Sequence, residues 1–195
     1  IMLGTQDPEE TRLLTHVEDP ADLLRERLRY AMNQAALNIR KAVDENPTYM
    51  GMGTTLVMVI IEDEQAHLAH VGDSRAYLIR DSRIQRLTRD HTVVQQEVDA
   101  GRLTPELARI VPHKNILTKS VGYHGPVDPD TSTRILEAGD LIILCSDGLN
   151  DAMEDHEIES ACIDVAPEDL PELLVKQAIE QGSEDNVTVV VLAVS

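Results

Sequence analysis

The sequence predicts an α+β fold in which antiparallel β-sheets form layers and helices cover them from outside. A long early segment has the apolar spacing of a helix, and a series of short segments rich in branched residues has the composition of strands. Turn-length connections join most neighbouring strands, which favours hairpins. The order of elements therefore indicates a layered α+β domain and argues against a doubly wound nucleotide-binding sheet.

The first expected element is a long helix that runs from Pro20 to about Glu45. Asp19 is a good N-cap residue, and the ring of Pro20 suits the first helical position. Apolar residues then recur at steps of three and four: Leu24, Leu28, Ala31, Ala35, Ile39 and Val43. We expect this stripe to lie on a hydrophobic surface.

Four short strands are expected next, joined as one antiparallel meander. They span residues 54–62, 66–72, 75–80 and 83–88. The turns between them fall at Asp63–Glu64, Asp73–Ser74 and Asp81–Ser82. Acidic and small polar residues in these connections are typical of tight turns.

The helical period returns between residue 91 and about residue 111, in two short pieces. The second piece opens with Thr104 as N-cap and Pro105 as first helical residue. Further strands are expected at residues 131–137, 141–145 and 186–195, and further helices near residues 155–162 and 167–181. The last strand is rich in valine, as strands commonly are.

Composition excludes several classes of function. The 195 residues carry 35 acidic and 17 Lys or Arg side chains, a formal net charge of −18. This balance disfavours nucleic acid and anionic membrane surfaces as partners. The chain has the length of one domain, spanning residues 1–195, and no apolar run long enough for a membrane span. Two cysteines without metal-ligand spacing fit a reducing, cytoplasmic compartment.

Three aspartates stand at the ends of predicted strands. Asp147 follows the apolar segment 141–146, Asp185 precedes the last strand, and Asp73 follows the strand 66–72. If the strands beside Asp147 and Asp185 are antiparallel neighbours, both carboxylates lie at one rim of the sheet. Carboxylates that close raise each other's pKa unless a cation is present, and an oxygen-only set favours Mg²⁺ or Mn²⁺ over Zn²⁺.

The same residues also have a purely local interpretation. Asp147–Gly148 and Asp185–Asn186 are ordinary turn dipeptides, and Asp73 can accept hydrogen bonds from its own hairpin backbone. In the metal interpretation, Gly148 permits a tight turn and the close approach of a metal, water or phosphate. Each pair by itself is weak evidence, and the combination of the three favours a metal site.

Six motifs in order carry a family resemblance. They are MGTTLVMVI (52–60), HVGDSRAYLIR (70–80), LTRDHT (87–92), LTKSVG (117–122), CSDGL (145–149) and EDNVTVVV (184–191). Together they resemble the bacterial type-2C, metal-dependent Ser/Thr protein phosphatases. The resemblance implies a sandwich of two antiparallel sheets flanked by helices, with Mn²⁺ or Mg²⁺ at its edge.

The resemblance also implies a chemistry and a set of ligands. In the family, a water that bridges two metals hydrolyses phosphoserine or phosphothreonine in proteins, so no side chain is assigned as nucleophile. By motif, Asp147 and Asp185 correspond to ligands of the two-metal centre, and Asp73 to a ligand of a third site. Gly148 and Asn186 correspond to supporting turn residues, and residues from about 91 to 115 to a mobile flap. The implied partners are phosphorylated proteins and a Ser/Thr kinase with its targets.

The sequence departs from the family pattern in one respect. Family members carry an Asp-Gly-x-Gly-Gly segment upstream of the long helix, whose Asp bridges the catalytic metals. The only Asp-Gly here is Asp147–Gly148, so the sequence is similar to the family domain without its first strands. We therefore expect negligible hydrolysis by these 195 residues alone.

Two other functions remain open at this point. The first is a non-catalytic relative that binds phosphoproteins or a partner and lacks the bridging ligand. The second is a phosphatase of sigma-factor antagonist proteins, against which the expected flap counts.

Several other polar residues near the motifs are expected to be structural. We expect Cys145 to be a core thiol, and His67 and His70 to be packed or surface residues of a strand and not metal ligands. Arg75 and Arg89 can reach a phosphate, but paired surface charges explain them equally well.

Overall fold

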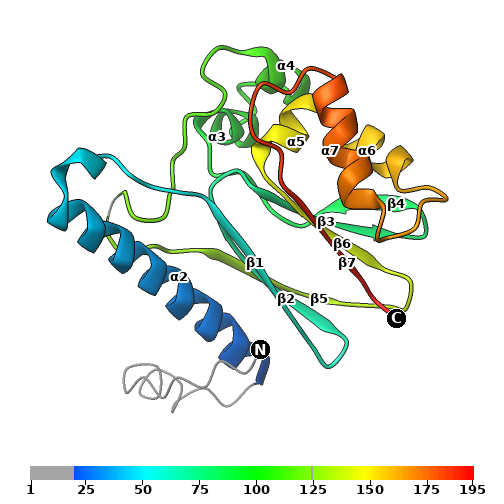
Figure 1. Ribbon diagram of the computed structural model, residues 1–195, viewed down its shortest axis with the longest axis horizontal. Helices are drawn as coiled ribbons and strands as arrows, with labels where there is room; N and C mark the ends of the chain where they lie inside the picture. The colour runs from blue at the N-terminus through cyan, green and yellow to red at the C-terminus, as the bar shows by residue number, and fades with distance from the viewer. Residues whose placement is uncertain (1–19, 124) are drawn as a thin grey trace.

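The computed structural model describes residues 20–123 and 125–195, and Figure 1 shows their arrangement. The helices of this part are α2 (Pro20–Glu45), the 3-10 turn η1 (Pro47–Tyr49), α3 (Val93–Asp99), α4 (Pro105–Ile110), α5 (Asp147–Ala152), α6 (Asp155–Ala161) and α7 (Leu170–Glu180). The strands are β1 (Leu56–Glu62), β2 (Gln65–Val71), β3 (Arg75–Arg80), β4 (Arg83–Arg86), β5 (Asp130–Ile135), β6 (Leu141–Cys145) and β7 (Val189–Ala193). None of the helices in these ranges is long and apolar enough to cross a membrane.

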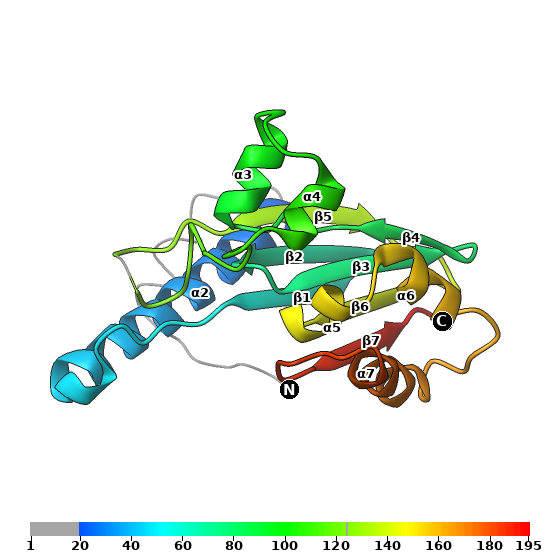
Figure 2. The same cartoon turned by 90° about the horizontal axis from the view of Figure 1, so that it is seen from above.

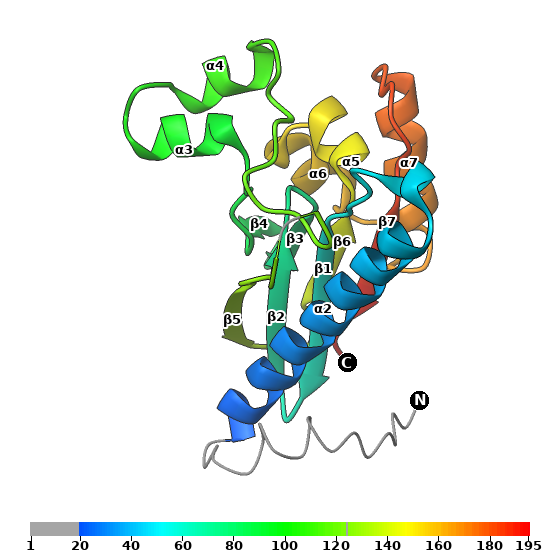
Figure 3. The same ribbon diagram turned by 90° about the vertical axis from the view of Figure 1, so that its left-hand side faces the viewer.

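The strands form two antiparallel sheets, which confirms the predicted fold class. One sheet has the order β1-β2-β5 and the other the order β4-β3-β6-β7. Helix α2 lies across the first sheet, and α5, α6 and α7 lie on the second (Figures 1 and 3). The result is a four-layer sandwich of helix, sheet, sheet and helices.

Alternation along the strands explains why the layers hold together. On β2, Leu68 faces the other sheet, whereas Ala69 faces α2. On β6, Ile142 faces inward, whereas Ile143 contacts the layer of α5, α6 and α7. Because successive side chains of a strand point to opposite faces, a strand buried on both faces must be apolar at nearly every position. This is the reason for the continuous apolar run in β6.

The expected four-strand meander is wrong at its middle connection. The turns at Asp63–Glu64 and Asp81–Ser82 are two-residue hairpin turns with positive φ at both residues. In contrast, β2 and β3 lie in different sheets. The connection at Gly72–Asp73–Ser74 therefore crosses between the sheets at their rim, with Gly72 at φ +104°.

The buried stripe of α2 matches the expected one in part. Leu24 and Leu28 are buried, and Ala35 and Ile39 pack half-buried against the core, as expected. The buried positions advance in steps of four, at Leu24, Leu28, Met32 and Ala36, and Ala31 is exposed. A line of residues four apart drifts slowly around a helix, so the contact follows a helix that crosses its sheet obliquely. The predicted N-cap Asp19 lies outside the described residues.

The excursion after β4 has the two predicted helices and the predicted N-cap Thr104, and Thr92 is a second N-cap that was not predicted. Thr92 and Thr104 accept hydrogen bonds from Gln95 N and Leu107 N, at 3.2 and 3.3 Å. Figure 2 shows α3 and α4 projecting beyond the sheets. Helix α5, in contrast, is not expected from the sequence, because Asp147–Gly148 was interpreted as a turn.

Candidate metal centre and cleft

The strands β6 and β7 bring two predicted site residues to one rim. They are antiparallel neighbours, with Cys145 opposite Val189. Asp147 follows the end of β6 as the first residue of α5, and Asp185 lies in the loop that leads into β7. The assumed adjacency of these strands is therefore present in the structure.

Side-chain and backbone contacts lock the two loops together. Ser146 Oγ donates to Asn186 O at 3.0 Å and accepts from Thr188 N at 2.9 Å. Ser183 Oγ donates to Gly148 O at 2.8 Å. A Cβ atom on Gly148 would lie 2.6 Å from Asn186 O. The close approach that Gly148 permits is thus made by the backbone of Asn186.

Both rim aspartates also make the local bonds that the turn interpretation predicts. Asp147 Oδ1 accepts from Gly148 N at 3.0 Å, and Asp185 Oδ1 accepts from Asn186 N at 2.6 Å. These bonds orient each carboxylate while using one of its two oxygens. A carboxylate has about four acceptor positions, so capacity for a cation remains on each.

Asp73 reaches the same rim from the crossing between the sheets. It is buried, at 8% exposure, although it has no cationic partner among the described ion pairs. The turn around it is held by the packing of Thr55 on Gly72 and by a 2.8 Å bond between Thr55 Oγ1 and Ser74 Oγ. A rigid turn therefore presents a buried acid.

The pKa values show that the three acids share one electrostatic environment. Burial, followed by the charge of Asp147, raises the pKa of Asp73 to about 6. Burial, followed by the charges of Asp185 and Asp151, raises the pKa of Asp147. The charge of Asp147 acts on Asp73 and the charge of Asp185 acts on Asp147, so Asp147 is the central member of the group.

This donor set fits a hard divalent cation. Carboxylate oxygens are the ligands that Mg²⁺ and Mn²⁺ prefer, and a bound cation would stabilise the ionised forms that burial and repulsion disfavour. With Asp147 in the middle, the geometry suits neighbouring cation positions that share one carboxylate rather than a single closed cage.

A cleft of about 480 Å³ lies between this rim and the α3–α4 segment. Both Asp73 and Asp147 line it. Its other charged groups are the acids Asp90, Glu106, Asp151, Glu154 and Asp155 and the cations Arg75, Arg86, Arg109 and Lys114. Seven carboxylates against four cations give the lining a formal charge of −3.

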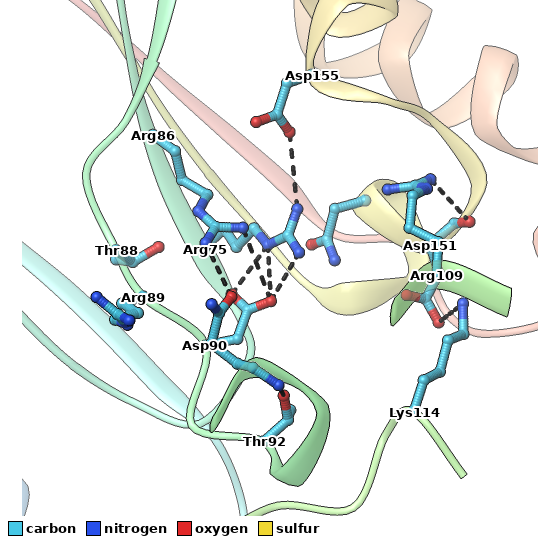
Figure 4. A network of polar contacts seen from close by, with 12 residues as sticks. Arg75, Arg86, Thr88, Arg89, Asp90, Thr92, Arg109, Lys114, Asp151 and Asp155 are labelled. Atoms are coloured by element: carbon cyan, nitrogen blue, oxygen red, sulfur yellow. Dashed lines mark hydrogen bonds and ion pairs between the residues drawn. The ribbon is translucent and has the colours of Figure 1, made fainter. Parts of the chain in front are cut away.

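The cations of the cleft wall are engaged by oxygen atoms of the protein (Figure 4). Arg75 donates to both carboxylate oxygens of Asp90, with Nη2 2.6 Å from Oδ2. Arg86 Nη2 donates to Gln95 Oε1 at 3.1 Å. Lys114 Nζ and Arg109 Nη2 reach Asp151, at Oδ2 (3.0 Å) and at the backbone O (3.5 Å).

A histidine cluster lies behind the cleft. In the described part of the chain, His70, His91 and Asp130 are the group whose possible ligand atoms lie within 4.8 Å of one another, so the three rim aspartates are spread more widely. However, Lys119 Nζ is 2.8 Å from Asp130 Oδ1. His91 Nδ1 accepts from Gly72 N, and His70 Nε2 bonds the backbone of Arg89. These contacts balance the charge of the cluster without a metal, although His91 Nε2 is buried without a hydrogen-bond partner among the described residues.

The residues expected to be structural have burial or partners that agree with this expectation. Burial raises the pKa of the Cys145 thiol to about 12, which makes it inert. His67 is buried and bonds Thr133 Oγ1 at 3.2 Å. Arg89 pairs with Asp99 at the surface. Arg75 is paired too, but its pair with Asp90 is buried and does not lie on the surface.

Comparison with known proteins identifies the family. The model of the family described as protein phosphatase 2C matches residues 6–110, more than half of the chain. The chain belongs to this family. It is 42% identical over 156 residues to the protein phosphatase PhpP of Streptococcus pneumoniae, covering 77% of this chain and 62% of PhpP. The chain thus spans less than two thirds of the length of this relative.

Solved structures of type-2C phosphatases superpose on the same layers. The serine/threonine phosphatase Stp1 from Staphylococcus aureus matches with a TM-score of 0.86 and 33% identity, covering 95% of this chain and 73% of Stp1. The catalytic domain of the serine/threonine phosphatase PstP in complex with two manganese ions matches with a TM-score of 0.76 and 33% identity, covering 96% and 79%. The family membership and fold inferred from the six motifs are confirmed.

Sequence reasoning missed part of this type-2C phosphatase cleft. Asp151 lies one helical turn after Asp147, so both face the cleft once α5 is known to be a helix. Asp90 was seen only as part of a motif, without its role as the partner of Arg75. The four-residue spacing of Asp147 and Asp151 was the available signal, and it was hidden by the interpretation of Asp147–Gly148 as a turn.

Substituting Gly148 by alanine is expected to destabilise the protein by about 1–3 kcal/mol, the usual cost of overpacking. The added Cβ meets the Asn186 carbonyl, which is backbone and cannot move without separating the loops of Asp147 and Asp185. Urea unfolding measures the cost. Gly53→Ala is the control with the smaller expected loss, because its Cβ would meet Tyr123 Cβ at 3.3 Å and the Val121 carbonyl oxygen at 3.4 Å, contacts that small shifts can relieve. Equal stability of the two variants would contradict this role of Gly148.

The metal-free protein is expected to lose stability as the pH rises through about 6. Asp73 has a folded-state pKa raised to about 6, whereas an unfolded Asp titrates near about 3.9. Such an acid contributes stability below the lower value and loses it as the pH rises through the higher one. In EDTA, the unfolding free energy should fall between about pH 4 and about pH 6 by on the order of 1–2 kcal/mol more for wild type than for Asp73→Asn, after discounting for solvent screening.

Saturating Mn²⁺ should reverse this difference, because the cation stabilises the ionised carboxylate. If the unfolding free energies of wild type and Asp73→Asn in EDTA depend on pH in the same way, burial and the charge of Asp147 do not raise the pKa of Asp73.

Proposed function

We propose that this protein is a metal-dependent phosphatase that hydrolyses phosphoserine and phosphothreonine in proteins. The observation that carries the proposal is that Asp73 and Asp147 line one acidic cleft, while the charge of Asp185, in the loop before β7, acts on Asp147. Asp147 and Asp185 are proposed as ligands of the two-cation centre and Asp73 as a ligand of a third position shared with Asp147. Family membership and the manganese-bound PstP structure support this assignment.

The charge of the cleft explains why the reaction needs cations. A phosphate monoester carries close to two negative charges at neutral pH, and the cleft lining has a formal charge of −3. The four cationic side chains of the lining already have oxygen partners. Bound Mn²⁺ or Mg²⁺ supplies the missing positive charge, lowers the pKa of an attacking water and offsets charge in the transition state.

The remaining residues position this centre. The bonds of Ser146 to the loop before β7 hold Asp147 and Asp185 at a fixed separation. Gly148 and Asn186 serve as the supporting turn because their backbones touch there. The Arg75–Asp90 pair anchors the chain just before α3, and Lys114 ties the end of the α3–α4 segment to α5.

We further propose that residues 91–115 form a flap over the cleft within one domain of residues 1–195. The segment lines one wall of the cleft and projects beyond the sheets (Figure 2). Its presence supports a phosphoprotein phosphatase over a phosphatase of sigma-factor antagonists. Cytoplasmic localisation, with a Ser/Thr kinase and its targets as partners, completes the proposal and rests on the two unpaired cysteines and the family.

Two measurements test the proposal. Isothermal titration of the 195-residue chain with Mn²⁺ should show binding that weakens in Asp147→Asn and in Asp185→Asn. The protein produced from its natural open reading frame should hydrolyse a phosphothreonine peptide only with Mn²⁺ or Mg²⁺. Cation binding and phosphopeptide binding without any hydrolysis would instead establish a non-catalytic relative. Absence of cation binding by the folded chain would refute the metal centre itself.

A further inference from the structure

A single residue bonds both backbone polar groups of Gly72, which precedes Asp73. Gly72 N–H donates to His91 Nδ1 at 3.1 Å, and His91 N–H donates to Gly72 O at 2.9 Å. These bonds tie the crossing between the sheets to the segment that precedes α3. The two peptide units that flank Gly72 can therefore rotate only if His91 moves with them.

The surroundings of His91 hold its ring in one orientation and one tautomer. The side chain is 8% exposed, and its ring stacks on that of His70 with centroids 4.8 Å apart and an angle of 10° between planes. Since Nδ1 accepts a hydrogen bond, the proton of the neutral ring must lie on Nε2. That buried nitrogen faces Asp130 Oδ1 at 3.3 Å. Burial, followed by the proximity of His70, lowers the pKa of His91 and keeps the ring neutral.

The conformation of Gly72 makes this bonding consequential. Its φ of +104° is one that residues with a side chain rarely adopt, and the packing of Thr55 leaves no room for a Cβ. Glycine is required here, yet glycine is also the residue with the widest choice of backbone angles. Contacts from outside the turn must therefore select one conformation. The packing of Thr55 restricts the space at the Gly72 Cα, and the two bonds to His91 fix the directions of the Gly72 N–H and C=O.

We propose that His91 is a positioning residue for Asp73: its Nδ1 fixes the Val71–Gly72 peptide unit, which leads into the turn, and thereby the direction in which the Asp73 carboxylate meets a divalent cation. The inference rests on the proposed role of Asp73 as a ligand, and adds a residue that acts on the cation only through the backbone. Residues that orient a metal ligand in this way typically change metal affinity by about 10- to 100-fold when replaced.

The test uses cation binding rather than turnover. Mn²⁺ titration of the 195-residue chain, followed by electron paramagnetic resonance, gives the affinity of each class of site, and Asp73→Asn identifies the class that depends on Asp73. His91→Phe keeps an aromatic ring on His70 but removes the acceptor. His91→Asn places a carbonyl oxygen close to the position of Nδ1. Asp130→Asn changes the partner of Nε2 and leaves Nδ1 intact.

We expect His91→Phe to weaken the Asp73-dependent site by about 10-fold while His91→Asn and Asp130→Asn stay close to wild type. A merely structural role for the ring predicts the reverse, with phenylalanine tolerated and asparagine harmful. If His91→Phe does not fold, His91→Gln supplies the comparison, because it keeps a polar side chain but moves its acceptor by one bond. In wild type, the nitrogen-15 shift of His91 Nδ1 should be that of an unprotonated ring nitrogen.

The outcomes separate this inference from the proposed function. If Asp73→Asn weakens Mn²⁺ binding but His91→Phe and His91→Gln do not, His91 is not a positioning residue and the metal centre stands. If Asp73→Asn leaves binding unchanged while Asp147→Asn weakens it, Asp73 is not a ligand and the inference falls alone. If none of these variants alters Mn²⁺ binding, both the role of His91 and the proposed metal-dependent function are refuted.

Discussion

Replacing Asp147 by asparagine is expected to abolish most Mn²⁺ binding. In the protein produced from its natural open reading frame, the same change should lower phosphopeptide hydrolysis by more than about 100-fold, beyond the range typical of an outer ligand partner. The reason is its central position. Its charge acts on Asp73, and the charge of Asp185 acts on it, so it is the carboxylate that neighbouring cation positions share. Asparagine keeps the size and one oxygen but removes the negative charge.

The same substitution weakens Mn²⁺ binding but should leave the metal-free protein at least as stable as wild type. Burial and the charge of Asp185 raise the pKa of Asp147, so its ionised form is unfavourable at neutral pH without a cation. The melting temperature of Asp147→Asn in EDTA should therefore equal or exceed that of wild type. Asp128→Asn is the control, because that exposed acid pairs with Arg29 away from the cleft. A destabilised Asp147→Asn that still binds Mn²⁺ normally would mean that Asp147 is structural.

The sequence predicted the strands best where composition and turn chemistry agreed. Each strand from β1 to β7 lies within two or three residues of its expected place. The hairpin turns at Asp63–Glu64 and Asp81–Ser82 were recognisable for the same reason. Local pattern does not, however, specify which sheet a strand joins. The connection at Asp73 has the length of a hairpin turn. Only long-range packing on both faces of β2 and β3 places these two strands in different sheets.

In the candidate site, too, local pattern predicts some residues, whereas others depend on tertiary contacts. Asp73, Asp147 and Asp185 were named from strand ends and from the family motifs, and antiparallel pairing of β6 with β7 brings two of them together. The partners of these acids could not be named. Asp151 can be identified only once α5 is known to be a helix. Asp90 can be identified only from its contact with Arg75, 15 residues away in the sequence, and His91 only from the fold that brings it back to Gly72. Such contacts depend on tertiary geometry that periodicity does not encode.

Breaking the Arg75–Asp90 pair from one side is expected to produce the largest loss of stability, about 3–5 kcal/mol for Arg75→Ala. Their side chains are only 12% and 11% exposed, and the guanidinium contacts both oxygens of Asp90. Arg75 also donates to the buried Tyr77 hydroxyl at 3.0 Å. Alanine would leave the Asp90 carboxylate buried, with Arg86 at 4.0 Å as the nearest remaining cation.

The loss should come from the unpaired charge rather than from the absence of the pair. In the double variant Arg75→Met with Asp90→Leu, both charges are gone, and well-packed apolar pairs of this kind are often as stable as the ion pair that they replace. We therefore expect urea unfolding to show that the double variant recovers most of the loss. Arg89→Ala is the matched control, because Arg89 pairs with Asp99 at the surface and should cost no more than about 1 kcal/mol.

The position of the pair predicts where the damage begins. Asp90 lies two residues before Thr92, the N-cap of α3, so an unpaired Asp90 should loosen the start of the α3–α4 segment first. Amide hydrogen exchange in Arg75→Ala should accelerate at residues 91–99 before it does in β6. Uniform acceleration, or a double variant no more stable than Arg75→Ala, would mean that the arginine acts through its packing and its bond to Tyr77, with the charge of Asp90 playing no part.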